Sequence, residues 1–248
     1  MPGKMAAWRG DLKPQFGSGG NVIGGRCMGI DKIASKSSLI TPELEEQMKG
    51  VFAKLEGEVE LVCVIDPEAA ASVEMAELVR HISDLTDKLS CQLYDREEAK
   101  EKLPEADVSL LPATVLRRQG KYTGISFHGV TGGKELNSLI FAIYNAAGPG
   151  QEMDKRMKKK LDKLTHKSEI KIFVSLSCHH CAQQVITCQK MAAECEALEA
   201  RMIDARLYPE MVEKYKIERI PMTVINEKEV LMGSKNMDEI YQVLRTYK

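Results

Sequence analysis

Apolar and polar residues follow one another along the chain in a pattern typical of alternating short strands and amphipathic helices. A β-branched run at 59–65 predicts a buried strand. Before it, Thr41 as N-cap and Pro42 at the first helical position begin a predicted helix that runs to about Leu55. After it, apolar residues at helical spacing predict a helix over 71–89. Further strands are predicted near 91–95, after Pro112 and near 124–128, with a helix over about 133–146.

The second half of the chain repeats this order. Strands are predicted at 169–176, 199–204, 222–226 and 229–232, and helices at 179–196, at 208–216 and from 236. Each half is therefore β-α-β followed by β-β-α, with the first strand pair parallel and the last pair a hairpin. A shared Pro-x-Thr-Val segment aligns Pro112 with Pro221 at an offset of 221 − 112 = 109. The sequence thus predicts two copies of one α/β fold.

Composition marks the boundaries between these parts. Residues 1–38 are glycine-rich without an apolar period, which predicts a flexible leader. The Gly-Pro-Gly breaker after Ala147 ends a first fold at 39–150. A lysine-rich stretch at 151–166 predicts a solvated linking helix, and 167–248 forms the second fold.

The overall charge balance argues against some classes of partner. The chain has 248 residues, 44% of them hydrophobic, and a formal net charge of -1, which gives no electrostatic reason to expect nucleic acid or an anionic membrane. No apolar run approaches the roughly 20 residues that span a bilayer, and no signal peptide is visible. The 7 cysteines lack the even, dense spacing of a secreted disulfide framework. We therefore expect a cytoplasmic protein whose cysteines are mostly thiols.

Cys178 and Cys181 form a close pair that follows a predicted strand and begins a predicted helix. The amides at a helix start favour a thiolate, which is the form that attacks a disulfide. Cys178 is the expected attacking thiol, and Cys181, one turn further on, the expected resolving thiol. His179 and His180 lie on the same turn and are candidate modulators, because as cations they would stabilise the thiolate further.

The other cysteines have simpler interpretations. Cys188 and Cys195 share a helix face with Cys181, and we read them as small buried apolar residues rather than extra redox or metal ligands. The remaining thiols are predicted core residues in strands, Cys63 and Cys91, and an exposed thiol in the leader, Cys27.

A lone Cys-x-x-Cys motif also occurs in zinc sites. Here a second ligand pair would have to come from His179 and His180 or from the downstream cysteines, and two adjacent histidines inside the pair do not readily turn to one tetrahedral centre. We expect redox use of the pair, with no bound metal and no other cofactor.

About 40 residues after the dithiol, the segment Arg219-Ile-Pro-Met-Thr223 ends a loop and opens a predicted strand. A dithiol at a helix start with a later Ile-Pro-x-Thr resembles the thioredoxin and glutaredoxin superfamily. That resemblance implies that Pro221 is a cis proline facing Cys178. It also implies that the backbone there lacks an N–H donor, and that an extended substrate segment adds beside it like an extra strand.

The stretch Ser-Leu-Ser-Cys-His-His-Cys at 175–181 and the two-copy layout are similar to a more specific family over about residues 42–248. This is the N-terminal domain of the flavoprotein subunit of alkyl hydroperoxide reductase. The resemblance implies two thioredoxin-like folds in tandem with a redox dithiol only in the second, and Pro112 as a relic in the first. It also implies electron transfer from a thioredoxin-reductase-like flavoprotein to a peroxiredoxin.

The sequence departs from this family in several respects. No flavin or NADH domain follows Lys248, so we expect the electron donor to be a separate reductase or part of a longer chain. His180 stands where asparagine is common. Ile172 occupies the place of the buried acid of thioredoxin, so the proton linked to Cys181 must pass elsewhere, to water or a nearby histidine.

Two other functions remain open from the residues. One is a general disulfide reductase or isomerase, like the archaeal tandem-thioredoxin oxidoreductases, although these usually carry a dithiol in both halves. The offset of 109 places Ala69 and Ser72 where the second copy has its cysteines. The other is a non-catalytic binding module whose first copy is a docking surface.

Overall fold

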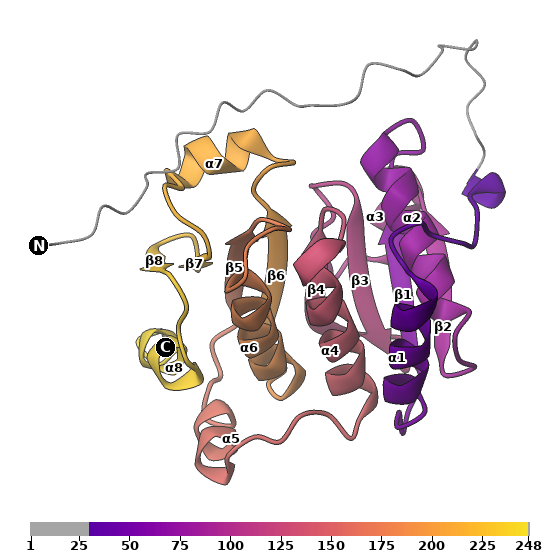
Figure 1. Ribbon diagram of the computed structural model, residues 1–248. Helices are drawn as coiled ribbons and strands as arrows, with labels where there is room; N and C mark the ends of the chain where they lie inside the picture. The colour runs from indigo at the N-terminus through magenta and orange to yellow at the C-terminus, as the bar shows by residue number, and fades with distance from the viewer. Residues whose placement is uncertain (1–29, 248) are drawn as a thin grey trace, which may run out of the picture.

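The computed structural model describes residues 30–247, and its centre is one continuous sheet (Figure 1). This 8-stranded sheet has the order β2-β1-β3-β4-β6-β5-β7-β8. Its strands are β1 (Val59–Val64), β2 (Leu89–Tyr94), β3 (Ala113–Arg118), β4 (Lys121–His128), β5 (Ser168–Val174), β6 (Leu198–Asp204), β7 (Met222–Ile225) and β8 (Glu229–Met232). Both halves of the chain contribute to it.

Most strands of the sheet run in the same direction. β1 is parallel to β2, β4 to β6 and β5 to β6, while β3 and β7 are antiparallel to their neighbours. The carboxyl ends of β1, β4, β5, β6 and β8 therefore lie at one end of the sheet. The loops at that end carry the dithiol.

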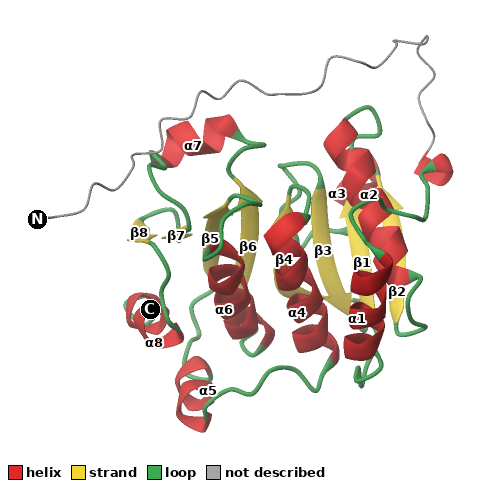
Figure 2. Ribbon diagram, in the orientation of Figure 1, coloured by secondary structure: helices red, strands yellow, loops and turns green. Residues whose placement is uncertain are grey.

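Helices cover both faces of the sheet (Figures 1 and 2). They are α1 (Pro42–Phe52), α2 (Ala70–Ser83), α3 (Arg96–Lys102), α4 (Leu136–Ala147), α5 (Lys155–Leu161), α6 (Cys181–Ala193), α7 (Pro209–Tyr215) and α8 (Met237–Leu244), with short 3-10 turns η1 (Ile30–Lys32) and η2 (Gly133–Glu135). The apolar sides of α1, α2, α4, α6 and α8 share one core with one face of the sheet. The opposite face has separate small cores under α3 and α7.

The expected duplication is confirmed, and each copy has the order β-α-β-α-β-β-α. The predicted hairpins and parallel pairs are present as well. The sequence did not indicate that the copies share a sheet. They join where β4 pairs with β6 in parallel, with Ile125 opposite Ala200, and α4 packs against α6 on one face of this junction.

Several element boundaries differ from the prediction. No helix was predicted between the strands near 91–95 and after Pro112, where α3 forms, because this short helix has no apolar stripe; it begins with a capping box between Asp95 and Glu98. The predicted helix over 71–89 ends at Ser83. The linking helix predicted over 151–166 shortens to α5, which buries Met157 and Leu161.

Part of the predicted leader packs on the first copy. Ile33 is buried, and Arg80 donates to its carbonyl oxygen. The amide of Ser37 donates to Nδ1 of the buried His81 at 3.2 Å, so the first copy begins before the boundary predicted at 38. Residues 1–29, including Cys27, lie outside the described residues.

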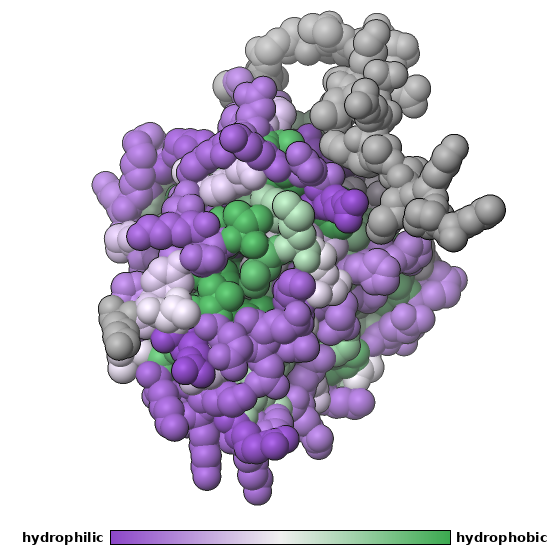
Figure 3. Space-filling model, turned by 90° about the vertical axis from the view of Figure 1, so that its left-hand side faces the viewer, coloured by the Kyte–Doolittle hydropathy of each residue, from purple (hydrophilic) through white to green (hydrophobic). Residues whose placement is uncertain are grey.

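At the other edge of the sheet, β8 exposes Val230 and Met232. Figure 3 faces this side of the molecule and shows apolar side chains gathered among polar ones. Within residues 30–247 no helix is both long and apolar enough to cross a bilayer.

Candidate functional site

The two cysteines of the predicted pair are joined in a disulfide, with their Cα atoms 5.4 Å apart. Cys178 lies in the turn after β5, where its amide donates to the carbonyl of Ser175 at 2.9 Å. Helix α6 begins at Cys181, two residues later than predicted. Cys178 therefore precedes the helix instead of beginning it, and the disulfide ties its sulfur to the first helical residue.

The start of α6 has no side-chain cap. His180 occupies the N-cap position in a helical conformation, and its side chain accepts no hydrogen bond from the helix amides. Because those amides carry partial positive charge, they favour negative charge on a nearby sulfur. The site can thus stabilise a thiolate at Cys178.

The two sulfurs differ in access to solvent. Cys181 is fully buried, whereas Cys178 is half-buried. His179 and His180 are both exposed, and within the described residues neither ring makes a hydrogen bond or ion pair. A partner can reach Cys178, while the modulating role of the histidines stays a prediction.

Pro221 lies next to the strand that leads to the dithiol. The Ile220–Pro221 peptide is cis, and the following Met222 pairs with Phe173 of β5. The carbonyl of Pro221 accepts from the amide of Gly233 at 2.9 Å. Pro112 repeats this arrangement in the first copy with a cis peptide and a bond from Gly129 at 2.9 Å.

Gln184 connects the cysteine helix to the proline strand. Its side-chain amide donates to Oγ1 of Thr223 at 3.3 Å, and its Oε1 accepts from the amide of Lys235 at 2.6 Å. The side chain is buried, so these bonds are shielded from water. They fix α6 against β7 and the loop after β8.

Glu135, which the sequence analysis did not single out, is a buried acid contributed by the first copy. Its Oε2 accepts from Ser138 at 2.6 Å, while its Oε1 is buried without a hydrogen-bond partner among the described residues. Burial raises the pKa of Glu135 to about 7, and the nearby charge of Asp204 acts in the same direction. A carboxyl with such a pKa can exchange a proton near neutral pH.

The loop that carries Glu135 touches the dithiol loop directly. The amide of Lys134 donates to the carbonyl of Leu176 at 3.2 Å. A Cβ on Gly133, whose φ is +57°, would lie 2.9 Å from that same carbonyl oxygen. Glycine therefore permits the close approach, and η2 packs against α6.

The corresponding place in the first copy holds no thiol. Ala69 precedes α2, and the buried Ser72 accepts from the amide of Asp66 at 3.1 Å through its hydroxyl. Beside Leu111 there is a pocket of about 510 Å³. The first copy therefore keeps the backbone arrangement of the dithiol site but has no cysteine pair to carry out thiol-disulfide exchange.

The remaining described cysteines are thiols. Cys63 and Cys188 are fully buried, which raises the pKa of each to about 12, and Cys195 is also buried. Cys91, expected in the core, is only half-buried because β2 is an edge strand, and its pKa is raised to about 11. Across residues 30–247 no group of three or more His, Cys, Asp or Glu side chains is placed to hold a metal ion.

Comparisons with known proteins agree with this geometry. A thioredoxin domain family model matches residues 168–245. The alkyl hydroperoxide reductase AhpF of Staphylococcus aureus (strain Mu50) is 26% identical over 206 residues, which cover 83% of this chain and 38% of that protein. The chain therefore spans well under half the length of these curated relatives.

Solved structures give a more specific match. The N-terminal domain of alkylhydroperoxide reductase AhpF from Enterococcus faecalis is 35% identical, with a TM-score of 0.77, over 83% of this chain and 99% of that one. A protein disulfide oxidoreductase from Aeropyrum pernix, at 17% identity and a TM-score of 0.75, shares the fold over 83% of this chain and 92% of its own.

The Cys178–Cys181 disulfide on this fold makes the chain a thiol-disulfide oxidoreductase. Its identity to the Enterococcus structures extends across both copies and beyond the segment that the thioredoxin model matches. The chain belongs to the family of the N-terminal domain of the alkyl hydroperoxide reductase AhpF.

Proposed function

We propose that the chain carries electron pairs as the Cys178–Cys181 dithiol and passes them to the disulfide of a peroxiredoxin. The observation that carries this proposal is the disulfide with its half-buried Cys178, at the uncapped start of α6. A cis proline before the neighbouring strand β7 supports it. The relatives' name, alkyl hydroperoxide reductase, supports a place in peroxide reduction.

The transfer is a pair of thiol-disulfide exchanges. In the reduced protein the Cys178 thiolate attacks one sulfur of the partner's disulfide, a bond forms between the two proteins, and the partner's other sulfur leaves as a thiolate. Cys181 then attacks Sγ of Cys178, which forms the internal disulfide and releases the second partner sulfur. The protein loses two electrons and two thiol protons, and the partner gains them.

The proton of Cys181 requires an acceptor, because the Cys181 side chain is fully buried. We assign this role to Glu135, whose pKa is raised to about 7 and whose Oε1 is without a partner among the described residues. Its carboxylate takes up the proton as Cys181 attacks and releases it to solvent later. This role would connect the first copy to the chemistry of the second.

Pro221 would contribute to partner binding rather than to proton transfer. The segment before it, at Ile220, is half-buried and lies at the dithiol end of the sheet. Proline removes a backbone donor, and an extended partner segment can lie beside it like an added strand. Such a segment would carry its disulfide to the sulfur of Cys178.

Electrons would enter from a thioredoxin-reductase-like flavoprotein by the reverse exchange. The curated relatives are much longer than this chain, so the donor is either a separate protein or another part of a longer polypeptide. In both cases a reduced dithiol of the donor attacks the Cys178–Cys181 disulfide.

The proposal is tested by mixing the reduced chain with an oxidised peroxiredoxin of the same organism under anaerobic conditions. Thiols are counted on each protein after separation. We expect the chain to lose the two thiols of its dithiol for every peroxiredoxin disulfide reduced, and a Cys178→Ser variant to transfer nothing. An intact reduced dithiol that leaves the peroxiredoxin oxidised would refute this choice of acceptor.

A further inference from the structure

The loops around the dithiol are predominantly cationic. They are the segments of the second copy that follow β5, β6 and β8 and precede β7, together with the segment after β4, which the first copy contributes. Their solvent-accessible charged side chains are Lys134, Arg206, Lys216, Arg219 and Lys235, with Glu218 as the exposed carboxylate. Glu135 in these loops and Asp204 at the end of β6 are buried.

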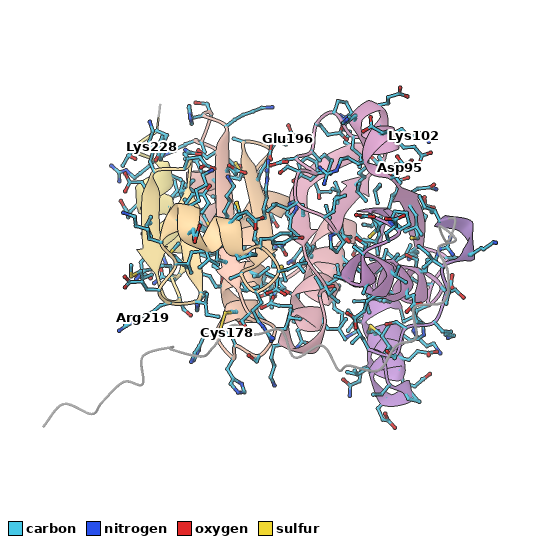
Figure 4. All side chains as sticks on the ribbon, turned by 90° about the horizontal axis from the view of Figure 1, so that it is seen from above. Asp95, Lys102, Cys178, Glu196, Arg219 and Lys228 are labelled. Atoms are coloured by element: carbon cyan, nitrogen blue, oxygen red, sulfur yellow. A yellow bond between two sulfur atoms is a disulfide. The ribbon has the colours of Figure 1, made fainter. Side chains whose placement is uncertain are left out.

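Three of these cations belong to segments that border the dithiol loop or the strands beside it. Lys134 donates its amide to Leu176, on the dithiol loop. The amide of Arg206 donates to Asp204 at 3.0 Å, at the end of the strand beside β5. Arg219 comes two residues before the cis proline, and Figure 4 shows it on the same margin of the molecule as Cys178.

These three cations form no ion pair. Among the described residues no carboxylate lies within 4 Å of the side-chain nitrogens of Lys134, Arg206 or Arg219, although the charge of Arg206 also acts on the buried Asp204. Exposed charges within about 8 Å of one another interact at physiological salt, and these three side chains together give the end of the sheet that carries Cys178 a positive character.

The same end of the first copy lacks this excess of cations. Its pocket is lined by Asp66, Asp95 and Glu97 with Arg96, while Lys100 and Lys102 of α3 pair with Glu97 and Glu98. In Figure 4 Asp95 lies on the other side of the molecule from Cys178. The excess of positive charge is therefore found at the end that carries the dithiol.

We infer that the dithiol recognises protein partners whose segment around the attacked disulfide is acidic. This inference rests on the proposed function and specifies its substrate. The partner's carboxylates lie over Lys134, Arg206 and Arg219 while its extended backbone passes Ile220 and Pro221. The first copy offers no such excess of cations, so the partner is directed to the second copy.

The test uses two disulfide-bridged model peptides that differ only in carrying Glu or Lys on both sides of each cysteine. The reduced full chain is mixed with each peptide in a single turnover, quenched with acid, and its remaining thiols are alkylated and counted by mass spectrometry. At about 10 mM ionic strength we expect the acidic peptide to react roughly tenfold faster, and the ratio to fall towards one at about 0.5 M salt.

Two charge reversals locate the effect. Arg219→Glu is expected to lower the ratio of acidic to basic peptide rates several-fold. Lys228→Glu makes the same change in the β7–β8 turn, at the opposite end of the sheet, and leaves the ratio unchanged. Equal rates, or a faster basic peptide at low salt, would overturn the inference. If neither peptide oxidises the dithiol, the proposed function itself fails.

Discussion

Cys178 and Cys181 are three residues apart, and the first residue is half-buried while the second is fully buried. Burial disfavours a charged thiolate, so Cys181 requires a base close by when it attacks. Glu135 is the buried carboxyl that the loop after β4 brings to this end of the sheet. At the level of single residues, the proposed chemistry thus uses an acid that lies 46 positions before Cys181 in the chain (181 − 135 = 46).

Replacing Glu135 by Gln is expected to slow the release of the partner from the mixed disulfide by at least about tenfold, because general bases contribute this much or more. In the wild type this rate should rise with pH through about 7, the pKa of Glu135, and Glu135→Gln should lose that inflection. Stopped-flow measurements of this release rate from pH 5.5 to about 8.5 test the prediction. The exposed Glu58→Gln is the control, and an unchanged pH profile in Glu135→Gln would exclude the proposed base.

The same group predicts a pH dependence of stability. Burial raises the pKa of Glu135 from 4.5 to about 7, so the folded state binds the proton more tightly than the unfolded state. Its favourable contribution is present below pH 4.5 and is lost as pH rises through about 7. Between pH 5 and 8 the free energy of unfolding of the wild type should fall by up to about 3 kcal/mol more than that of Glu135→Gln. Urea denaturation at each pH measures this difference. An equal loss in both proteins would contradict this.

At the level of elements, a capping box begins the helix that follows the loop beside Pro221. Helix α8 begins with a capping box in which Asn236 accepts from the amide of Glu239 at 2.9 Å and Glu239 accepts from Asn236. The preceding residue, Lys235, is bonded to Gln184 of α6. The cap thus supports the loop that borders Pro221.

Asn236→Ala should lower the free energy of unfolding by about 1 kcal/mol, because one helix amide loses its side-chain partner. Urea denaturation measures the change. The matched control is Asn137→Ala on the exposed side of α4, where alanine has the better helix propensity and stability should stay within about 0.5 kcal/mol. A similar loss in both variants would argue against a specific role for the cap.

Much of this level could be predicted from the sequence. β1 and β7 are β-branched and almost wholly buried, so their apolar runs indicate strands directly. The motif around Cys178 likewise indicated the redox pair, because both cysteines lie in one short stretch of sequence. α3 was not predicted, since only Ala99 of its residues is buried, and the sole local signal was the spacing of Asp95 and Glu98. Glu135 could not be found because its role depends on contacts with the second copy.

At the scale of the whole molecule, the pairing of β4 with β6 turns two small folds into one sheet. This junction requires a glycine at position 124, where φ is +76° and a Cβ would lie 2.3 Å from the carbonyl oxygen of Leu198. Pairing between copies has no local signature in the sequence, because each edge strand looks like any other half-buried strand. The shared sheet therefore emerged only from the structure.

Gly124→Ala should destabilise the protein by at least about 2 kcal/mol more than Gly120→Ala in thermal or urea unfolding. Both glycines have a positive φ, but a Cβ at Gly120 has nothing within 4 Å, so the pair separates backbone strain from collision. Equal destabilisation would mean that the close approach to Leu198 adds nothing.

The transfer of electrons from Cys178 to a partner, through a mixed disulfide resolved by Cys181, is tested most directly by trapping that species. Reduced Cys181→Ser is mixed with oxidised peroxiredoxin and examined by non-reducing mass spectrometry, with Cys178→Ser as the comparison. We predict a one-to-one covalent complex through Cys178 in Cys181→Ser, released by dithiothreitol, and no complex in Cys178→Ser. A complex that forms equally in Cys178→Ser, or none in either variant, would contradict this mechanism.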